Sequence, residues 1–458
     1  MTSNASRLQG VSRRRFLRSQ ISVALAAAAF PVIIPGSALG KNGFTAPSNR
    51  IGVGAIGVGP RGQDVLQGFL KDPRCQVIAL CDVKRKVLTT AKAKVDSVYS
   101  NSDCQIVADF RALVERPDLD AILIASPDHW HVLHALAAVR AGKDVYVEKP
   151  LGLSLGQDQR LREEIRNRSR VFQFGTQQRS DRNFRLACEL VRNGAIGRLN
   201  HINVWAPGSV AGGSTQRVAP PDDIDYESWL GPAPQREHTQ DLTLNEHWWY
   251  TSDFALGFIA GWGIHPIDIA LWGAGDLADG TVEVVGKGLF PSEGLHDTAT
   301  SWHVDYTFES KLTMKFASTP SPGSPNEPLG RRWSERYGRI EGHGTAFEGS
   351  EGWILVHRGG LHTNPEGLIE RDAGAFKTQL VRSSNHVGNF LEAVRSRAAT
   401  VSSIEAAVKS DAFCHIADIA IREEKPIRYD GRSETIPGDS SGNDRLHHRP
   451  LRKPWTLG

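Results

Sequence analysis

The stretch Arg50-Ile-Gly-Val-Gly-Ala-Ile-Gly-Val-Gly-Pro-Arg-Gly62 decides the fold class of this chain. It is apolar and β-branched up to Ile56 and then rich in glycine, which predicts a buried strand that ends in a tight turn. The spacing G-x-G-x-x-G occurs here in two overlapping registers. These are Gly52, Gly54, Gly57 and Gly57, Gly59, Gly62.

Only the second register follows a complete strand, the segment 51–56. A loop that binds the phosphates of a dinucleotide must follow a strand and open a helix, whose free N–H groups and dipole face the phosphates. Pro60 suits the first turn of that helix, where its missing N–H costs nothing. We therefore predict that the phosphate-binding glycines are Gly57, Gly59 and Gly62, with an ordinary glycine-rich turn as the alternative.

Asp82 ends the apolar run 77–82, at the distance from Gly62 where an acidic residue accepts hydrogen bonds from the adenosine ribose. Its carboxylate would repel a 2′-phosphate, so the sequence favours NAD over NADP. Lys84 and Arg85 follow directly and keep NADP possible.

Length and composition are those of a globular protein with two domains. The chain has 458 residues, of which 40% are hydrophobic and 23% charged. The net charge of +3 comes from five arginines in the first forty residues, which contain no acidic residue. Without them the charge is slightly negative, so we expect no nucleic-acid partner.

The segment 1–40 is predicted to be a signal peptide. Ser12-Arg-Arg-Arg-Phe-Leu-Arg18 resembles the twin-arginine export signal, and an apolar stretch and small residues follow it. We expect export by that route, to the periplasm, and no other membrane association. An anchor that is never cleaved is the alternative. The five cysteines are an odd number without C-x-x-C spacing and predict neither a zinc site nor a disulfide scaffold, and Cys75 and Cys81 are expected in the core.

Strand and helix patterns alternate over 48–170, which predicts a doubly wound α/β domain with a parallel sheet. The expected strands are 51–56, 76–81, 120–125 and 143–147, and the expected helices are 61–71, 83–97 and 130–141.

The pattern changes over 171–430, where we expect an α+β domain with an open, mainly antiparallel sheet. The segment 302–309 alternates apolar and polar residues, and 311–316 does the same after a tight turn at Ser310. A further strand is expected at 199–204, and helices at 182–193, 385–397 and 403–422. The tail 431–458 is rich in Gly, Arg, His and Pro and is expected to be loosely ordered.

Four motifs together resemble the glucose–fructose oxidoreductase, inositol dehydrogenase and rhizopine-catabolism (Gfo/Idh/MocA) family. They are the glycine-rich turn, Ser126-Pro-Asp-His-Trp-His131, Ala141-Gly-Lys-Asp-Val-Tyr-Val-Glu-Lys-Pro150 and Gly263-Ile-His-Pro-Ile-Asp268. The segments Tyr226-Glu-Ser-Trp-Leu-Gly-Pro-Ala-Pro234, Gly352-Trp-Ile-Leu-Val-His-Arg358 and Asn385-His-Val-Gly-Asn-Phe-Leu-Glu-Ala-Val-Arg395 resemble its exported, tryptophan-rich branch.

The resemblance implies oxidation of a sugar, glycoside or polyol carbinol with NAD, or NADP. It makes Lys149 the residue that hydrogen-bonds the reacting oxygen, positioned by Glu148, and His265 the general acid/base. It also places Ser126, Pro127 and His131 beside the cofactor. A surface lysine and a structural histidine are the alternatives for Lys149 and His265.

One position departs from the family pattern. Many relatives carry an aspartate four residues before the histidine, where this chain has Gly261. Asp268, one helical turn after His265, could orient the ring or bind a substrate hydroxyl, and Asp253 is the other candidate replacement.

The remaining candidates lie on the substrate side. Trp248 and Trp249 could stack on a sugar ring, or belong to the core. Arg179 is a weaker candidate. His129, His131 and His134 are close in sequence, but no carboxylate or cysteine cluster completes a site around them, so we predict no metal.

Export suggests one further property. Little free nicotinamide is expected outside the cytoplasm, so the cofactor should be tightly bound and restored within the site. The leading hypothesis is an oxidoreductase acting on a carbohydrate. The alternatives are a redox-neutral glycosidase that oxidises, eliminates and reduces, and a non-catalytic sugar-binding protein. We also expect a homo-oligomer, although the outward side chains of 303–309 are polar.

Overall fold

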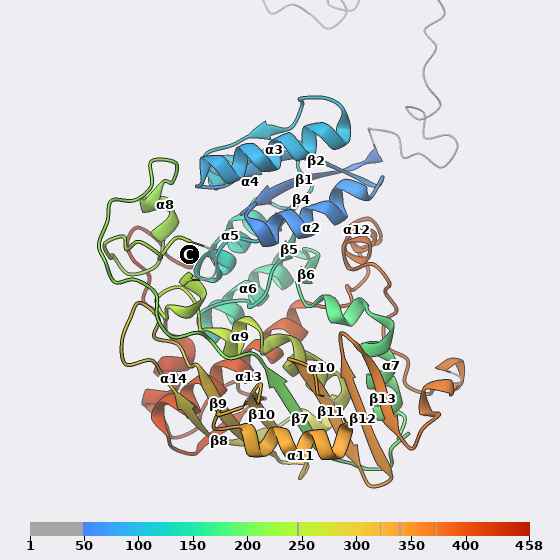
Figure 1. The fold of residues 1–458 in the computed structure, drawn as a ribbon. Coiled ribbons are helices and arrows are strands. Elements are labelled where there is room, and N and C mark those ends of the chain that lie inside the picture. Colours follow the sequence, from blue (N-terminus) through green and yellow to red (C-terminus); the bar gives the residue numbers. More distant parts are fainter. Residues whose placement is uncertain (1–48, 245–246, 321, 339, 372) are drawn as a thin grey trace, which may run out of the picture. The chain divides into compact units, whose positions relative to one another are not determined.

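The computed structural model describes residues 49–458 apart from 245–246, 321, 339 and 372. The predicted signal peptide therefore lies outside the described residues. Residues 51–458 form one compact unit that contains two sheets. Figure 1 shows the first sheet among the blue and cyan helices and the second among the green, yellow and orange elements.

The first sheet is parallel, with the order β3-β2-β1-β4-β5-β6. Its order reverses between β1 and β4, and ligands of such sheets bind at the carboxyl ends of the strands beside that switch point. The predicted doubly wound fold is confirmed. The strands are β1 (Ile51–Ile56), β2 (Cys75–Cys81), β3 (Gln105–Ile106), β4 (Ala121–Ile124), β5 (Asp144–Val147) and β6 (Phe172–Phe174).

Helices connect these strands close to the predicted positions. They are α2 (Pro60–Lys71), α3 (Arg85–Tyr99), α4 (Phe110–Val114), α5 (Asp128–Arg140) and α6 (Leu155–Arg168). Helix α6 was not predicted, because it is mostly polar and its apolar face is narrow. The Ser154 side chain accepts a hydrogen bond from the Gln157 N–H and so begins this helix.

The second sheet has eight strands in the order β13-β12-β11-β7-β10-β9-β8-β14. Only β7 and β10 pair in parallel, so the expected open, mainly antiparallel sheet is confirmed. The strands are β7 (Leu199–Ala206), β8 (Thr281–Leu289), β9 (Ser301–Phe308), β10 (Thr313–Ser318), β11 (Gly344–Gly349), β12 (Gly352–His357), β13 (Gly360–Asn364) and β14 (Ile427–Asp430).

Strand β9 shows the predicted alternation. Trp302, Val304 and Tyr306 are buried, whereas Asp305 and Thr307 are exposed. The Tyr306 hydroxyl donates a hydrogen bond of 3.0 Å to the backbone oxygen of Phe413, which ties the sheet to the helix behind it.

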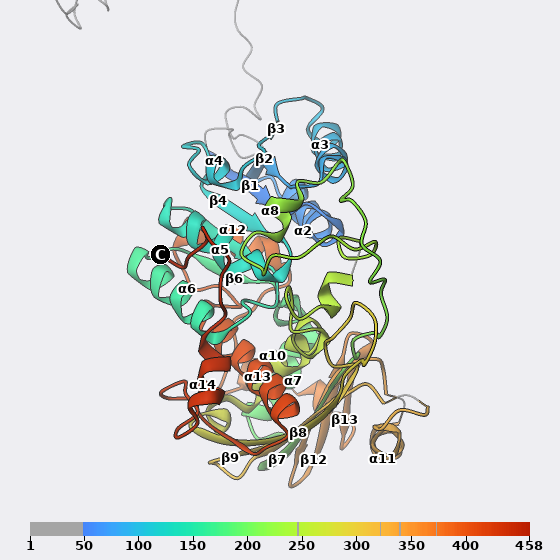
Figure 2. The ribbon, with the colours of Figure 1, turned by 90° about the vertical axis from the view of Figure 1, so that its left-hand side faces the viewer.

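Two helices of the second half, α10 and α13, lie between the two sheets (Figures 1 and 2). Helix α11 packs outside the second sheet, where Trp333 lies 4.9 Å from the Trp205 ring. The helices are α7 (Arg182–Arg192), α8 (Tyr226–Leu230), α9 (Phe258–Gly261), α10 (Ile264–Ala274), α11 (Glu327–Tyr337), α12 (His386–Ser396), α13 (Ile404–Glu423) and α14 (Ser440–His447). The short 3-10 helices include η2 (Gln177–Ser180) and η3 (His247–Tyr250).

Helix α12 belongs to the second half in sequence but packs against α2 of the first. Its Phe390 is fully buried, with ring centroids 6.1 Å from Phe69 and 6.0 Å from Tyr146. The first sheet therefore depends on a helix from the second half of the chain.

The prediction of a loosely ordered tail is wrong. Asp439 accepts a hydrogen bond from the Gly442 N–H at the start of α14, and Leu446 is fully buried. Beyond α14, the Arg452 N–H donates to the Pro232 carbonyl at 2.9 Å. The polar composition concealed this order, because the tail is held by hydrogen bonds and a few apolar anchors rather than by a periodic apolar face.

All five cysteines are buried and free, as expected for core residues. Within the part of the chain that the structure describes, no helix combines the length and the apolar character needed to span a bilayer.

We predict that Phe390→Ala lowers the free energy of unfolding by about 3 kcal/mol, because it leaves a cavity between α12 and α2. Urea unfolding followed by fluorescence measures this change. Glu392→Ala, on the exposed face of α12, should change it by no more than about 0.5 kcal/mol. Equal effects of the two substitutions would show that α12 is not part of the core.

Candidate active site

The glycine-rich turn between β1 and α2 leaves its outer side open. Gly57 has φ of 78°, and a Cβ there would lie 2.4 Å from the Ser126 nitrogen. A Cβ on Gly62 would lie 2.1 Å from the Gly57 oxygen, so this glycine lets the helix approach the strand. At Gly59 a Cβ would meet no atom within 4 Å. The turn therefore gives a phosphate free access to the start of α2.

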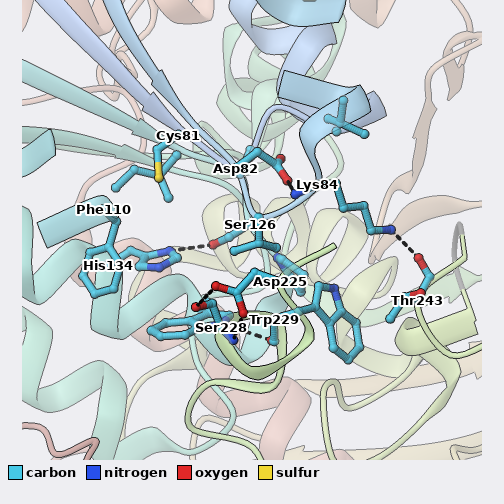
Figure 3. Close-up of a pocket in the computed structure, with 18 of the residues that line it drawn as sticks. Cys81, Asp82, Lys84, Phe110, Ser126, His134, Asp225, Ser228, Trp229 and Thr243 are labelled. Atoms are coloured by element: carbon cyan, nitrogen blue, oxygen red, sulfur yellow. Dashed lines mark hydrogen bonds between the residues drawn. The ribbon is translucent and has the colours of Figure 1, made fainter. Parts of the chain in front are cut away.

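Asp82, at the end of β2, is hydrogen-bonded to the same turn. Its carboxylate accepts from the Val58 N–H at 2.8 Å and from the Lys84 N–H at 2.9 Å. Burial raises the pKa of Asp82, and these hydrogen bonds oppose the shift. The Lys84 ammonium donates to the Thr243 carbonyl (Figure 3), and Arg85 donates to the Asp222 carbonyl. Both cations that could have bound a 2′-phosphate thus already have partners.

A cleft of about 690 Å³ opens along this edge of the sheet. Gly57, Gly59 and Asp82 line it, and so do Ser126, Pro127, Trp248 and Trp249. Its size, and a lining that combines the glycine-rich turn with the Asp82 carboxylate, fit a dinucleotide. Further lining residues are Arg61, Phe110, Arg111, Trp130, His134, Asp225, Ser228, Trp229 and Trp455.

Two distant segments complete the walls of this cleft. The Arg85 N–H donates to the Asp223 carbonyl at 2.8 Å, which joins the segment before α8 to the end of β2. Figures 1 and 2 show α8 beside α5. From the tail, Trp455 packs 4.7 Å from Trp130 and 6.1 Å from Phe110, measured between ring centroids.

The histidines that follow β4 are all hydrogen-bonded to nearby groups and so hold the end of this strand in place. Ser126 Oγ lies 3.0 Å from His134 Nδ1 (Figure 3), and His129 Nε2 lies 3.0 Å from the Trp229 carbonyl. The two ring nitrogens of His131 lie 2.7 Å from the Ser126 and Pro150 carbonyls. His131 was expected beside the cofactor, but it ties the end of β4 to the residue after Lys149 and does not line the cleft.

Glu148, at the end of β5, pairs with the glycine-rich helix. Its carboxylate accepts 2.8 Å hydrogen bonds from Arg61 and from the Gln177 side chain. Burial alone would raise the pKa of Glu148, but Arg61 outweighs this and holds it below its usual value.

Lys149 points away from Glu148 toward α9 and α10. Its Nζ donates to the Gly261 carbonyl at 2.6 Å and lies 5.2 Å from the Trp249 ring centroid. Burial lowers the pKa of Lys149, and the carboxylates of Glu148 and Asp128 oppose this shift. Asp128 accepts from the Trp249 indole N–H at 3.2 Å, and burial raises its pKa while Lys149 opposes it. The cleft lining includes Trp249 but not Lys149, which lies just beyond it.

His265 is buried in the first turn of α10, four residues after the carbonyl that holds Lys149. Among the described residues, its Nδ1 has no hydrogen-bond partner. Burial sets the pKa of His265 well below its usual value, and the positive charges of Lys149 and Arg358 lower it further. The His265 ring is therefore uncharged near neutral pH.

Asp268 and Arg179 bind each other and do not line the cleft. Two hydrogen bonds of 2.7 and 2.8 Å join the carboxylate to the guanidinium, and the Ser410 hydroxyl donates to Asp268 at 2.8 Å. Both oxygens are thus used, so Asp268 does not orient His265 as proposed from the sequence. Asp253 pairs with Arg236 at 2.8 Å and does not replace the missing carboxylate either.

Several site residues escaped the sequence analysis. Asp128 and Trp229 lie within motifs on which the resemblance rests. The sequence did not predict that Asp128 would bind the Trp249 indole or that the Trp229 carbonyl would bind His129. Arg358 follows β12, and its Cζ lies 4.8 Å from the Trp262 ring beside His265. No sequence pattern indicated Trp455.

The oxidoreductase family with an NAD-binding Rossmann fold, Gfo/Idh/MocA, matches residues 51–176. The matched segment contains the glycine-rich turn, Asp82, the Ser126 segment and Lys149. Residues 51–176 are therefore similar to the Gfo/Idh/MocA family.

Individual relatives agree with this assignment. The chain is similar to myo-inositol 2-dehydrogenase of Thermotoga maritima, with 30% identity over 176 residues, which are 38% of this chain and 47% of that protein. A glycosyl hydrolase family 109 protein of Saccharopolyspora erythraea is 37% identical over 108 residues, 23% of this chain and 24% of the relative. The chain thus matches less than half the length of either relative.

A solved structure covers more of the chain. The WlbA dehydrogenase from Bordetella pertussis, in complex with NADH and UDP-GlcNAcA, has a TM-score of 0.59 at 13% identity. It covers 82% of this chain and 98% of its own. At this identity the likeness shows a shared fold, which extends into the second half of the chain.

We predict that Asp268→Asn lowers the free energy of unfolding by about 3 to 5 kcal/mol, because it leaves the Arg179 guanidinium buried without its counter-charge. Thermal or urea unfolding checks this. Asp253→Asn removes one partner of a more exposed pair and should cost less than about 1 kcal/mol. A stable Asp268→Asn protein with a raised KM would instead make Asp268 a substrate ligand.

Proposed function

We propose that this protein is an NAD-dependent oxidoreductase that acts on a carbinol of a sugar, glycoside or polyol. One observation carries the proposal. The Lys149 ammonium donates to the Gly261 carbonyl, lies 5.2 Å from the ring of Trp249, which lines a cleft that fits a dinucleotide, and is near enough to His265 to lower the pKa of its buried imidazole.

The side chains at this place suit the removal of a proton from a hydroxyl. Neutral His265 accepts the proton, and its buried Nδ1 has no other described partner. Lys149 gives up its hydrogen bond to the Gly261 carbonyl and donates to the substrate oxygen instead. It thereby stabilises the negative charge that develops on that oxygen. Bound NAD would supply the acceptor for the hydride.

The substrate class rests on the aromatic wall and on the relatives. Trp248 and Trp249 offer flat apolar faces beside Lys149, which suit the apolar face of a sugar ring. The relative from Thermotoga maritima is named myo-inositol 2-dehydrogenase, and myo-inositol is a polyol. Arg358, beside Trp262, is the residue we assign to the outer part of the substrate.

We further propose that the protein is exported by the twin-arginine route and holds its cofactor tightly. The sequence Ser12-Arg-Arg-Arg-Phe-Leu-Arg18 supports export. Support for retention comes from the walls that α8 and Trp455 add to the cleft. We expect a homo-oligomer, as proposed from the resemblance.

The first test uses the purified protein without added NAD. We predict bound nicotinamide by absorbance, and one stoichiometric reduction when the correct sugar or polyol is added. Lys149→Ala should keep the cofactor and lower the rate of reduction by about 10²-fold or more. Lys409→Ala, at an exposed lysine paired with Asp279, is the matched control and should react normally.

Other outcomes would overturn this function. Sustained release of an aryl aglycone without free cofactor would identify a glycosidase. Undiminished reduction by Lys149→Ala would remove Lys149 from the chemistry. A protein that neither carries nor binds NAD would overturn the proposal as a whole.

A second prediction concerns the pH dependence of kcat/KM. Because the pKa of His265 is lowered, its proton-accepting form persists below pH ~6.5, the ordinary value for histidine. The acidic limb should therefore lie below pH ~6.5. The pKa of Lys149 is also lowered. As pH rises, its ammonium therefore loses its proton before pH ~10.4, the ordinary value for lysine, and the basic limb moves to lower pH as well. An acidic limb at or above pH ~6.5 would contradict the neutral-histidine site.

A further inference from the structure

A second group of buried polar side chains lies outside the candidate active site, between α6 and α13. It consists of Asp158 on α6 and of Asp411 and His415, one turn apart on α13. One ligand atom from each lies within 4.8 Å of the other two. Helices α6 and α13 contact each other, and α13 lies between the two sheets (Figures 1 and 2).

These atoms are deeply buried and lack partners. The exposed fractions are 0% for Asp158 and Asp411 and 3% for His415. Within the described residues, both Asp158 oxygens, Asp411 Oδ1 and His415 Nε2 make no hydrogen bond. Burying carboxylates without a counter-charge is costly, and neighbouring carboxylates repel each other.

No arginine or lysine of the described chain neutralises the pair. Arg162, the nearest candidate on α6, pairs instead with Glu434 at 2.6 Å. The two carboxylates lie close enough to interact directly with each other. His415 Nε2 lies 3.8 Å from Asp158 and 3.5 Å from Asp411, and the Gly152 N–H donates to Asp411.

The nitrogen–oxygen distances in this group distinguish direct hydrogen bonding from shared binding of a metal ion. A charge-assisted hydrogen bond would bring nitrogen and oxygen to about 2.7 to 2.9 Å. Two ligand atoms that share a tetrahedral zinc ion, each about 2.1 Å from it, lie about 3.4 Å apart. The distances of 3.5 and 3.8 Å therefore match atoms that share a central ion better than atoms that bond each other.

From this geometry we propose that Asp158, Asp411 and His415 bind a divalent cation of the zinc class. Two carboxylates and a neutral imidazole carry a charge that a divalent ion balances. Three protein ligands and one water complete four-coordination at zinc. Calcium and magnesium fit poorly, because they need six or more oxygen ligands and this group includes a nitrogen. The site uses none of the histidines considered from the sequence.

The surroundings hold the ligands in place. The Gly152 N–H donates to Asp411 Oδ2 at 3.2 Å, as outer partners of metal ligands do. A Cβ on Gly152 would lie 2.4 Å from Asp158 Oδ1, so glycine makes the room for this carboxylate. Gly152 lies three residues after Lys149, so the ion would anchor the segment that carries Lys149 to α13.

The test measures metal directly and needs no activity. The full-length protein, purified without chelator or histidine tag, should contain about one zinc per chain by mass spectrometry. Dialysis against a strong chelator should lower Tm, and zinc, but not calcium or magnesium, should restore it. Cobalt added to the apoprotein should give the visible absorption of a four-coordinate site.

Variants assign the ligands. Asp158→Asn and His415→Gln should lose the metal, whereas Asp418→Asn, on the same helix and paired with Arg422, should retain it. If a ligand variant does not fold, the zinc titration of the wild-type apoprotein still decides. A wild-type protein that neither contains nor takes up zinc, or a His415→Gln variant that keeps it, would overturn the proposal and leave a shared proton as the neutralising charge.

Discussion

The ion pair between Arg61 and Glu148 connects the two parts of the candidate active site. Arg61 belongs to the helix that follows the glycine-rich turn, and Glu148 ends β5 directly before Lys149. The 2.8 Å contact therefore sets how the phosphate-binding turn stands relative to the lysine. Because Glu148 is buried, loss of Arg61 would leave Lys149 as the main cation that opposes its charge.

The second half of the chain positions Lys149 and His265, the first through a backbone carbonyl and the second through a buried ion pair. The Gly261 carbonyl fixes Lys149, while the Arg179–Asp268 pair fixes the helix that carries His265. Position 261, where the resemblance led us to expect an aspartate, is a glycine, and its carbonyl oxygen accepts a hydrogen bond from the Lys149 ammonium. His265 is consequently set by burial and by neighbouring cations rather than by a carboxylate.

Local patterns were sufficient to predict the first sheet from the sequence. β1, β2, β4 and β5 are continuous apolar runs with turn signals at their ends, and the alternation of β9 and β10 is equally plain. Helix α6 was missed because its exposed face is long and charged, and the tail because its order comes from single contacts. A pattern along the chain records which face of an element is buried, but not which distant segment covers it.

The same limit applies to the candidate site. Gly57, Gly62 and Asp82 follow from the geometry of one turn, which is local. From the sequence, Asp268 was expected to interact with the nearby His265. In the structure both of its oxygens accept hydrogen bonds from Arg179, which lies far away in the sequence. Trp455 and the group around Asp158 depend on long-range packing, which spacing along the chain does not reveal.

The cleft walls come from segments spread between residues 56 and 455, and this links ligand binding to folding. A ligand that binds only the assembled cleft stabilises every segment that forms it, by a free energy that grows with the logarithm of ligand concentration. Conversely, a bound dinucleotide can leave once the Asp223–Trp229 segment or the tail detaches, while both sheets stay folded. In the proposed function, cofactor exchange would require local opening of these two peripheral segments and not unfolding of the core.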